Sequence, residues 1–155
     1  MSTGIEYLSN MASVAEVAEH LSRCDADFVP PLSDRVEISD YAQTITRKAV
    51  RFEAWSGDIL VGLLAVYCND QETRAAYITS VSVLKTWTRR GIAARLVRKC
   101  IKHATDSGMR QIGLEVGSSN ASAIKLYEKS GFVAGKANTP FASMTLYLDS
   151  GEEHE

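Results

Sequence analysis

Apolar residues near the start of the chain recur every three or four positions, which is the spacing of an amphipathic helix. One such segment follows Ser13, a residue type that favours the start of a helix, and its apolar positions are Val14, Val17, Ala18 and Leu21. It is expected to end before Asp25. Residues 25–34 contain two consecutive prolines and are predicted to form a loop, because proline excludes the helical conformation from the residue before it. A second helix is predicted over residues 38–49, with one face formed by Tyr41, Ile45 and Ala49.

The period then changes from helical spacing to alternation. Val50, Phe52 and Ala54 alternate with Arg51, Glu53 and Trp55, which predicts a strand with one buried face. A hairpin turn at residues 56–58 leads into the continuous apolar run 59–67, typical of a central strand that is covered on both sides. A third strand is predicted over residues 75–84, with one face formed by Tyr77, Thr79, Val81 and Val83. These strands predict an antiparallel meander.

Helices and strands alternate in the second half of the chain. A helix begins near Gly91 and ends near Gly108, with an apolar stripe formed by Ile92, Leu96, Val97, Cys100, Ile101 and Ala104. Residues 111–116 form a strand, and a short helix capped by Ser119 or Asn120 ends at Gly131. Two further strands begin at Phe132 and at Phe141. Helices inserted between strands after a meander predict an α/β fold with a mixed sheet.

Size and composition limit the remaining choices. The 155 residues, 45% of them hydrophobic, are expected to form one domain over residues 1–148, followed by an acidic tail at residues 149–155. The net charge of -2 gives no electrostatic reason to expect a nucleic-acid partner. The apolar run 59–67 is too short to span a membrane, and the N-terminus lacks the pattern of a signal peptide.

The cysteines and histidines give no indication of a metal site. Cys24, Cys68 and Cys100 have no metal-binding spacing and are odd in number, which favours a reduced, cytoplasmic compartment. Cys100 falls on the apolar helix stripe and is expected in the core. His20 and His103 are predicted on helix surfaces without a second ligand nearby, so no metal is expected.

The turn at residues 89–93, Arg-Arg-Gly-Ile-Ala, joins the third strand to the following helix. The N–H groups at a helix N-terminus are unpaired and attract an anion, and small residues let a phosphate approach the backbone. An ordinary capped loop with two solvated arginines explains the same residues. The turn matches neither a Walker loop nor a dinucleotide-binding fingerprint.

Two longer segments carry a resemblance to a known family. Residues 81–93 resemble the signature motif of the GCN5-related N-acetyltransferases, and residues 114–132, LEVGSSNASAIKLYEKSGF, are similar to that family's second motif. They occur in the family's order and at its usual separation. The resemblance covers roughly residues 51–148 and implies the family's mostly antiparallel central sheet with helices on both faces. It departs from the family's pattern at Thr88, where Gln or Arg is usual.

The resemblance implies acetyl-coenzyme A as co-substrate. The positions that match the family's cofactor contacts are Val81, Ser82, Val83, Thr88, Arg89, Arg90, Gly91, Ile92, Ala93, Asn120 and Tyr127. Val81 and Val83 would act through their backbones, on a strand that bulges and separates from its parallel neighbour. Asn120 would cap a helix, contact the cofactor, or do both. Lys125 and Lys129 are either solvated or close to a phosphate.

Two residues match the family's catalytic positions. Tyr127 corresponds to the tyrosine that protonates the coenzyme A thiolate in many members, although its helical spacing alone would fit a core aromatic. Glu115 corresponds to the glutamate that acts as base in the ribosomal-protein branch, and a structural role on a solvated strand face stays open.

The resemblance therefore implies an N-acetyltransferase that acts by direct transfer in a ternary complex. An acyl-CoA sensor without turnover and a general nucleotide-binding protein are the alternatives. The acceptor, a small-molecule or protein amine, is expected at residues 24–41, and a homodimer is compatible with the sequence. That segment contains the acids Asp25, Asp27, Asp34 and Glu37, which would favour a cationic amine or form an ordinary polar loop.

Overall fold

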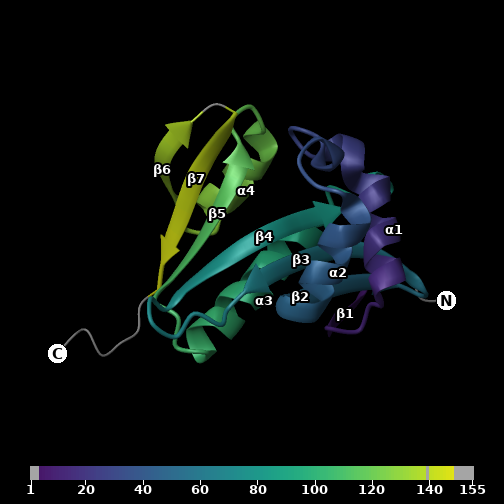
Figure 1. The fold of residues 1–155 in the computed structure, drawn as a ribbon, viewed down its shortest axis with the longest axis horizontal. Coiled ribbons are helices and arrows are strands. Elements are labelled where there is room, and N and C mark those ends of the chain that lie inside the picture. Colours follow the sequence, from purple (N-terminus) through teal and green to yellow (C-terminus); the bar gives the residue numbers. More distant parts are fainter. Residues whose placement is uncertain (1–3, 139, 149–155) are drawn as a thin grey trace.

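A single sheet in the strand order β1-β2-β3-β4-β5-β7-β6 organises the computed structural model, which describes residues 4–138 and 140–148 (Figure 1). The strands of this sheet are β1 Glu6–Ser9, β2 Val50–Ser56, β3 Ile59–Tyr67, β4 Ala75–Val83, β5 Gln111–Gly117, β6 Val133–Asn138 and β7 Phe141–Tyr147. Among the strands of the described ranges, only β4 and β5 pair in parallel. The predicted mixed, mostly antiparallel sheet is confirmed, while the predicted tail at residues 149–155 lies outside the described residues.

Helices cover both faces of this sheet, as the family resemblance implied (Figure 1). The α-helices are α1 Val14–Cys24, α2 Ile38–Lys48, α3 Ile92–Asp106 and α4 Ala121–Lys129. Short 3₁₀ turns form at η1 Asp25–Asp27, η2 Leu32–Asp34 and η3 Lys85–Trp87. Ser13 caps α1 as predicted: its hydroxyl accepts from the Glu16 N–H at 3.1 Å, and the Glu16 carboxylate accepts from the Ser13 N–H at 2.9 Å.

The apolar run of β3 lies between two separate cores. One core packs α1 and α2 against the sheet, with Leu21, Ile45 and Leu63 fully buried. The other packs α3 against the opposite face and continues to β5 and α4; Leu64 and Cys100 are fully buried in it. The expectation that β3 is covered on both sides is confirmed, as is the core position of Cys100.

The prediction of a single buried face for β2 is wrong. Arg51, Glu53 and Trp55 were expected to face solvent, but they are 4%, 0% and 7% exposed. Helices α1 and α2 cover this face of the strand, so the alternation of polar and apolar residues does not mark a solvated surface here. Two charged side chains are therefore buried, and they require hydrogen-bond partners to offset the loss of water.

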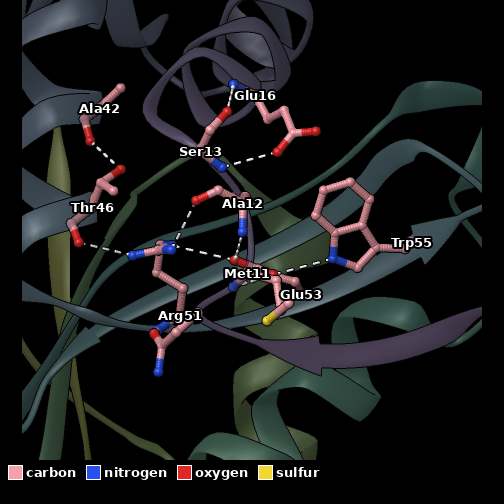
Figure 2. Close-up of polar contacts among 10 residues, drawn as sticks. Met11, Ala12, Ser13, Glu16, Ala42, Thr46, Arg51, Glu53 and Trp55 are labelled. Atoms are coloured by element: carbon pink, nitrogen blue, oxygen red, sulfur yellow. Dashed lines mark hydrogen bonds and ion pairs between the residues drawn. The ribbon is translucent and has the colours of Figure 1, made fainter.

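Glu53 and Arg51 supply each other with part of that compensation, as Figure 2 shows. The donors to the Glu53 carboxylate are the N–H groups of Met11 and Ala12, the indole of Trp55, and Nε of Arg51 at 3.3 Å. Arg51 also donates to the carbonyls of Thr46 and Ala12. Because Thr46 belongs to α2 and Ala12 precedes α1, this buried ion pair fixes both helices to β2.

Strand β1 was not predicted. It has four residues, too few to establish an alternation, and it pairs antiparallel with β2 from Glu6 opposite Trp55 to Ser9 opposite Phe52. The lateral pairing, rather than the local sequence, defines this edge strand.

A bulge in β4 overturns the prediction that Tyr77, Thr79, Val81 and Val83 share one face. Ser80 pairs with Ala65, and Ile78 pairs with the next residue along β3, so Thr79 is the extra residue. One inserted residue reverses the alternation of side chains. Val81 and Val83 consequently pack on the α3 side, whereas Tyr77 lies opposite Tyr67 and is 41% exposed.

His20 was predicted on a helix surface, and this is wrong: it is 2% exposed. Its Nδ1 lies 2.8 Å from the Leu60 carbonyl oxygen, and its Nε2 lies 2.9 Å from the Ser82 hydroxyl. A carbonyl can only accept, so Nδ1 carries the proton and Nε2 accepts from Ser82. His20 therefore joins α1 to β3 and β4 as a neutral ring.

We expect this burial to make stability depend on pH. Burial lowers the pKa of His20 below its ordinary value of 6.5. Between 6.5 and the lowered value, the unfolded chain binds a proton that the folded protein excludes, so stability falls as pH falls through that window. The slope should approach about 1.4 kcal/mol per pH unit at most. Urea unfolding from pH 7.5 to 5 measures it, and an equal slope in His20→Gln would contradict the assignment.

Candidate functional site

The two parallel strands of the sheet pair over only part of their length. Residues 75–78 of β4 pair with residues 111–114 of β5, and beyond Ile78 and Leu114 no pairing continues. Figure 1 shows the two strands starting together and then diverging. The bulge at Thr79 lies where the separation begins. The bulged and separated strand implied by the family resemblance is therefore present.

The divergence leaves backbone groups of β4 facing an open gap. The Leu84 N–H donates to the Val61 carbonyl on β3 at 2.8 Å. Because successive N–H groups of a strand point to opposite sides, those of Val83 and Val81 point away from β3, toward the gap. This edge can therefore pair with an extended ligand.

Tyr41 of α2 stabilises the bulge from the other side. Its hydroxyl donates to the Thr79 carbonyl at 2.8 Å and lies 2.7 Å from Thr79 Oγ1. A bulge interrupts ladder hydrogen bonding, so a side-chain donor at this carbonyl compensates for the loss. Desolvation by burial raises the pKa of Tyr41, which keeps the phenol protonated as a donor.

A cleft of about 850 Å³ lies between β4, the start of α3 and α4. It is lined by Cys24, Asp27 and Phe28, by residues 81–83, by Lys85 and residues 87–89 and 91–94, and by Asn120, Ser122, Ala123, residues 125–127 and Lys129. Of the eleven predicted cofactor positions, this lining includes all except Arg90. Residues from α1, η1, β4, α3 and α4 thus meet around one concavity.

One end of the cleft is the N-terminus of α3. Gly91 precedes the helix in the left-handed conformation, with φ +79, and a Cβ there would meet no atom within 4 Å. The first helical hydrogen bond runs from the Arg95 N–H to the Gly91 carbonyl, so the N–H groups of residues 92–94 are free to bind a ligand. Arg89 also has a positive φ of 65, which is uncommon outside glycine. An anion fits this end.

The charges around the cleft also favour an anion. The side chains of Lys85, Arg89, Lys125 and Lys129 line it, against a single carboxylate, that of Asp27. This local excess of positive charge contrasts with the chain's net charge of -2. Lys125 and Lys129 come from α4, opposite the α3 end, so the cations flank the opening from both sides. A ligand with several phosphates would be held there.

The side chains of two residues predicted to contact the cofactor, Thr88 and Arg90, interact within their own loop. The Thr88 hydroxyl, at one of the predicted cofactor positions, donates to the Lys85 carbonyl at 2.8 Å. Arg90 is turned onto the ring of Trp87, with its guanidinium carbon 4.6 Å from the ring centroid, and does not line the cleft. The Arg90 side chain therefore lies outside the lining of the cleft and stabilises the loop that carries Arg89 and Gly91.

Asn120 and Tyr127 lie where α4 meets the cleft. The Asn120 side chain caps the helix by accepting from the Ala123 N–H at 3.3 Å, and it also lines the cleft, so both expected roles are compatible. The Tyr127 ring is 7% exposed and packs edge-on against Phe132 at 5.7 Å. Burial raises the pKa of the Tyr127 phenol well above its ordinary value, with a smaller contribution from the Cys100 thiol.

A second hollow of about 90 Å³ adjoins the cleft. It is lined by residues 28–30 and Arg35, by residues 78–81 and 114–117, and by Asn120, Ala123, Tyr127 and Phe141. Glu115 is exposed into this hollow and does not line the cleft. Phe28, Val81, Asn120, Ala123 and Tyr127 line both. Tyr127 therefore lies at the junction between the cleft and the second hollow that contains Glu115.

The loop after α1 closes one side of the second hollow. A Cβ at Gly117 would collide with the backbone carbonyl of Val29, so only glycine permits the loop to lie on the end of β5. Phe28 and Val29 are thereby held against β5, which is far from them in sequence.

Several residues of the cleft were not among the predicted cofactor positions. Cys24, Asp27 and Phe28 belong to the segment 24–41 that was expected to hold the acceptor, and Lys85 lies in a polar turn after β4. Burial raises the pKa of Cys24 to about 11, so its thiol is neutral at pH 7. Cys24, Asp27 and Phe28 reach the cleft because α1 packs beside β4, and no local pattern encodes that packing.

Within residues 4–138 and 140–148, no group of three His, Cys, Asp or Glu side chains is arranged to hold a metal. Over the same ranges, no helix combines the length and apolar character that crossing a membrane requires.

Comparisons with known proteins agree with this geometry. The model of the acetyltransferase (GNAT) family matches residues 14–132. The N-alpha-acetyltransferase MAK3 of Arabidopsis thaliana is 36% identical over 77 residues, which cover 49% of this chain and 40% of that protein. Among solved structures, the NatC complex bound to Gag peptide and CoA has a TM-score of 0.74 at 23% identity, over 94% of this chain and 99% of that chain. The ribosomal-protein-S18-alanine N-acetyltransferase of Escherichia coli has a TM-score of 0.74 at 18% identity, over 94% and 95% of the two chains.

Proposed function

This chain belongs to the GNAT family of acetyltransferases, and on that basis we propose that it transfers an acetyl group from acetyl-CoA to a primary amine. The amine attacks the thioester directly while both substrates are bound. The whole of residues 1–148 would act as one catalytic domain, with coenzyme A in the cleft and the amine in the second hollow. The chain spans only 40% of the length of the plant relative, so its activity rests on the site rather than on that protein's name.

The observation that carries this proposal is the position of Tyr127. It is shared by a cationic cleft suited to a phosphorylated cofactor and by a hollow that contains the carboxylate of Glu115. A transferase must bring two substrates together at one point, whereas a binding module needs only the cleft. The solved NatC neighbour, which is bound to CoA, supports the same choice of cofactor.

The backbone of β4 would hold the cofactor. Its pyrophosphate would lie on the free N–H groups at the start of α3, between Arg89 and the lysines of α4. Its extended pantetheine arm would pair with the open edge of β4. The Val81 N–H, which points into the gap, would then donate to the thioester carbonyl and stabilise the negative charge that develops on its oxygen.

Glu115 and Tyr127 would move the protons. A free amine is mostly protonated at neutral pH, with a pKa of about 10, so Glu115 accepts a proton and leaves a neutral nucleophile. The C–N bond forms, the C–S bond breaks, and the thiolate receives a hydrogen bond and then a proton from Tyr127, while the second proton lost by the attacking nitrogen restores the Tyr127 phenol. Since burial raises the pKa of Tyr127, the proton stays on the phenol until negative charge develops on sulfur.

An assay of thiol release tests the proposed function. The protein is incubated with acetyl-CoA and a panel of primary amines, and free coenzyme A and acetylated amine are measured. We expect release that depends on the amine. Binding of acetyl-CoA without release for every amine would instead indicate a sensor, and equal affinity for ATP or NAD would indicate a general nucleotide site.

A further inference from the structure

The second hollow contains two charged side chains of opposite sign. Glu115 lies on β5, and Arg35 lies directly after η2. Both are within electrostatic reach of Tyr77, whose pKa is raised first by burial and then by Glu115, and is lowered by Arg35. In the described ranges, neither Glu115 nor Arg35 forms an ion pair. Each charge is therefore available to a ligand.

The guanidinium of Arg35 packs on an aromatic ring but donates no hydrogen bond to a described residue. Its guanidinium carbon lies 4.9 Å from the centroid of the Phe141 ring, which fixes the plane of the group. No described residue accepts a hydrogen bond from this guanidinium. Arginine in such a position presents donors suited to a carboxylate.

The acids of the same segment do not offset this cation. Both oxygens of Asp25 accept hydrogen bonds from Ser33, and Glu37 accepts from Ser39 and from the N–H of Asp40 at the start of α2. Asp27 lines the cleft rather than the second hollow. Asp34 lines neither the cleft nor the second hollow, so the segment contributes a cation and no carboxylate to the lining of that hollow.

A buried hydroxyl also lacks a partner beside this hollow. Ser80 lines it and is 5% exposed; its Oγ forms no hydrogen bond of ordinary geometry among the described residues, although it is near enough to the Tyr41 phenol to lower the pKa of that group. An unsatisfied buried hydroxyl is unfavourable, so a polar ligand atom at this point would be stabilised. Ser80 follows the bulge at Thr79 and precedes Val81, the residue whose N–H faces the gap.

The size of the hollow limits the ligand. Its volume of about 90 Å³ is roughly a tenth of the 850 Å³ of the cleft, so it accommodates a small group and not a coenzyme. An amine, one or two carbon atoms and a carboxylate fill such a space. Larger amines would leave most of their atoms outside it.

From these features we infer that the acceptor is a small zwitterionic amine, a free amino acid with a short side chain. Its amine lies toward Glu115 and Tyr127, its carboxylate is bound by Arg35, and Ser80 supplies a hydrogen bond. This inference rests on the proposed function, because it assigns the second hollow to the acceptor. Arg35 is then the residue that determines specificity.

The test compares alanine with alaninamide in the wild type and in Arg35→Gln. We expect kcat/KM for alanine to fall about 10- to 100-fold in the variant, the range for a lost charge-assisted hydrogen bond, while kcat/KM for alaninamide stays within about twofold. Comparing each acceptor between the two proteins cancels the different amine pKa values of the acceptors. Arg35→Lys should retain part of the activity with alanine, and Arg98→Gln, the same change on exposed Arg98 of α3, should retain all of it.

The outcomes separate this inference from the proposed function. Equal loss for alanine and alaninamide in Arg35→Gln, or no loss for either, would overturn the inference while leaving acetyl transfer intact. If no amine is acetylated, the proposed function fails. Calorimetric titration of alanine into the coenzyme A complex then decides the inference separately, because binding must weaken in Arg35→Gln but not in Arg98→Gln.

Discussion

Replacing Gly91 by Asp is expected to weaken coenzyme A binding by at least about 100-fold. Gly91 is the last residue before α3 and lines the cleft. A carboxylate there would lie beside the proposed pyrophosphate. At a separation of 4 Å, two like charges near a protein surface repel by about 4 kcal/mol, and about 2.7 kcal/mol already corresponds to 100-fold. Isothermal titration with coenzyme A measures the effect.

Gly91→Asn is the matched control for this charge. Asn and Asp have nearly the same shape, and both tolerate the left-handed conformation that Gly91 adopts at φ +79. A Cβ at this position would meet no atom within 4 Å, so both side chains begin in open space. We expect Asn to weaken binding by less than about 10-fold, because it lacks the like charge.

The thermal midpoints of the two variants exclude unfolding as the cause. A carboxylate at a helix N-terminus interacts favourably with the helix dipole, so Gly91→Asp should be no less stable than Gly91→Asn. Retained coenzyme A affinity in the Asp variant would show that the phosphates bind elsewhere.

Tyr127→Phe is expected to lower kcat by roughly 10- to 1000-fold, the effect of losing a general acid with a poorly matched pKa. The substitution removes only the hydroxyl. The ring that packs against Phe132 stays, so the buried surface of α4 is preserved. Coenzyme A affinity should change less than about twofold, because the proposed cofactor contacts are backbone groups of β4 and α3 together with cations.

Tyr147→Phe serves as the control for this prediction. Tyr147 is 68% exposed, lies at the end of β7, and is not part of the cleft or of the second hollow. Steady-state rates of both variants at saturating acetyl-CoA provide the comparison. If Tyr127→Phe turned over as fast as Tyr147→Phe, Tyr127 would have no place in the mechanism.

Local sequence patterns predicted an element correctly where the burial of one face determines its conformation. The apolar stripe of α3, the capping residue Ser13 and the apolar run of β3 each predicted the observed element. In these segments, backbone hydrogen bonding and burial favour the same conformation, so the local pattern and the final structure agree. The turn at residues 89–93 belongs to this group, since a glycine before an apolar-periodic helix also creates the free N–H groups at its start.

Sequence patterns led to a wrong prediction where segments distant in sequence bury a side chain, or where a bulge interrupts a strand. Arg51 and Glu53 alternate with apolar residues like a solvated strand face, yet α1 and α2 bury them. A bulge at Thr79 interrupts the alternation of side chains in β4, and no distinctive residue type marks this bulge in the sequence. His20 looks like a helix-surface residue until β3 and β4 supply its two partners.

The sequence by itself determined the family, the mixed sheet and most of the residues around the cofactor cleft, because these follow from contiguous motifs. Only the tertiary structure decided that Glu115 and Tyr127 line the same second hollow, that Arg90 turns away from the cleft, and that Arg35 rather than the neighbouring acids lines that hollow. The physical reason is that these positions depend on how α1, the loop after it and β5 pack together. Contacts between residues that are far apart in the sequence produce no periodic pattern in the sequence.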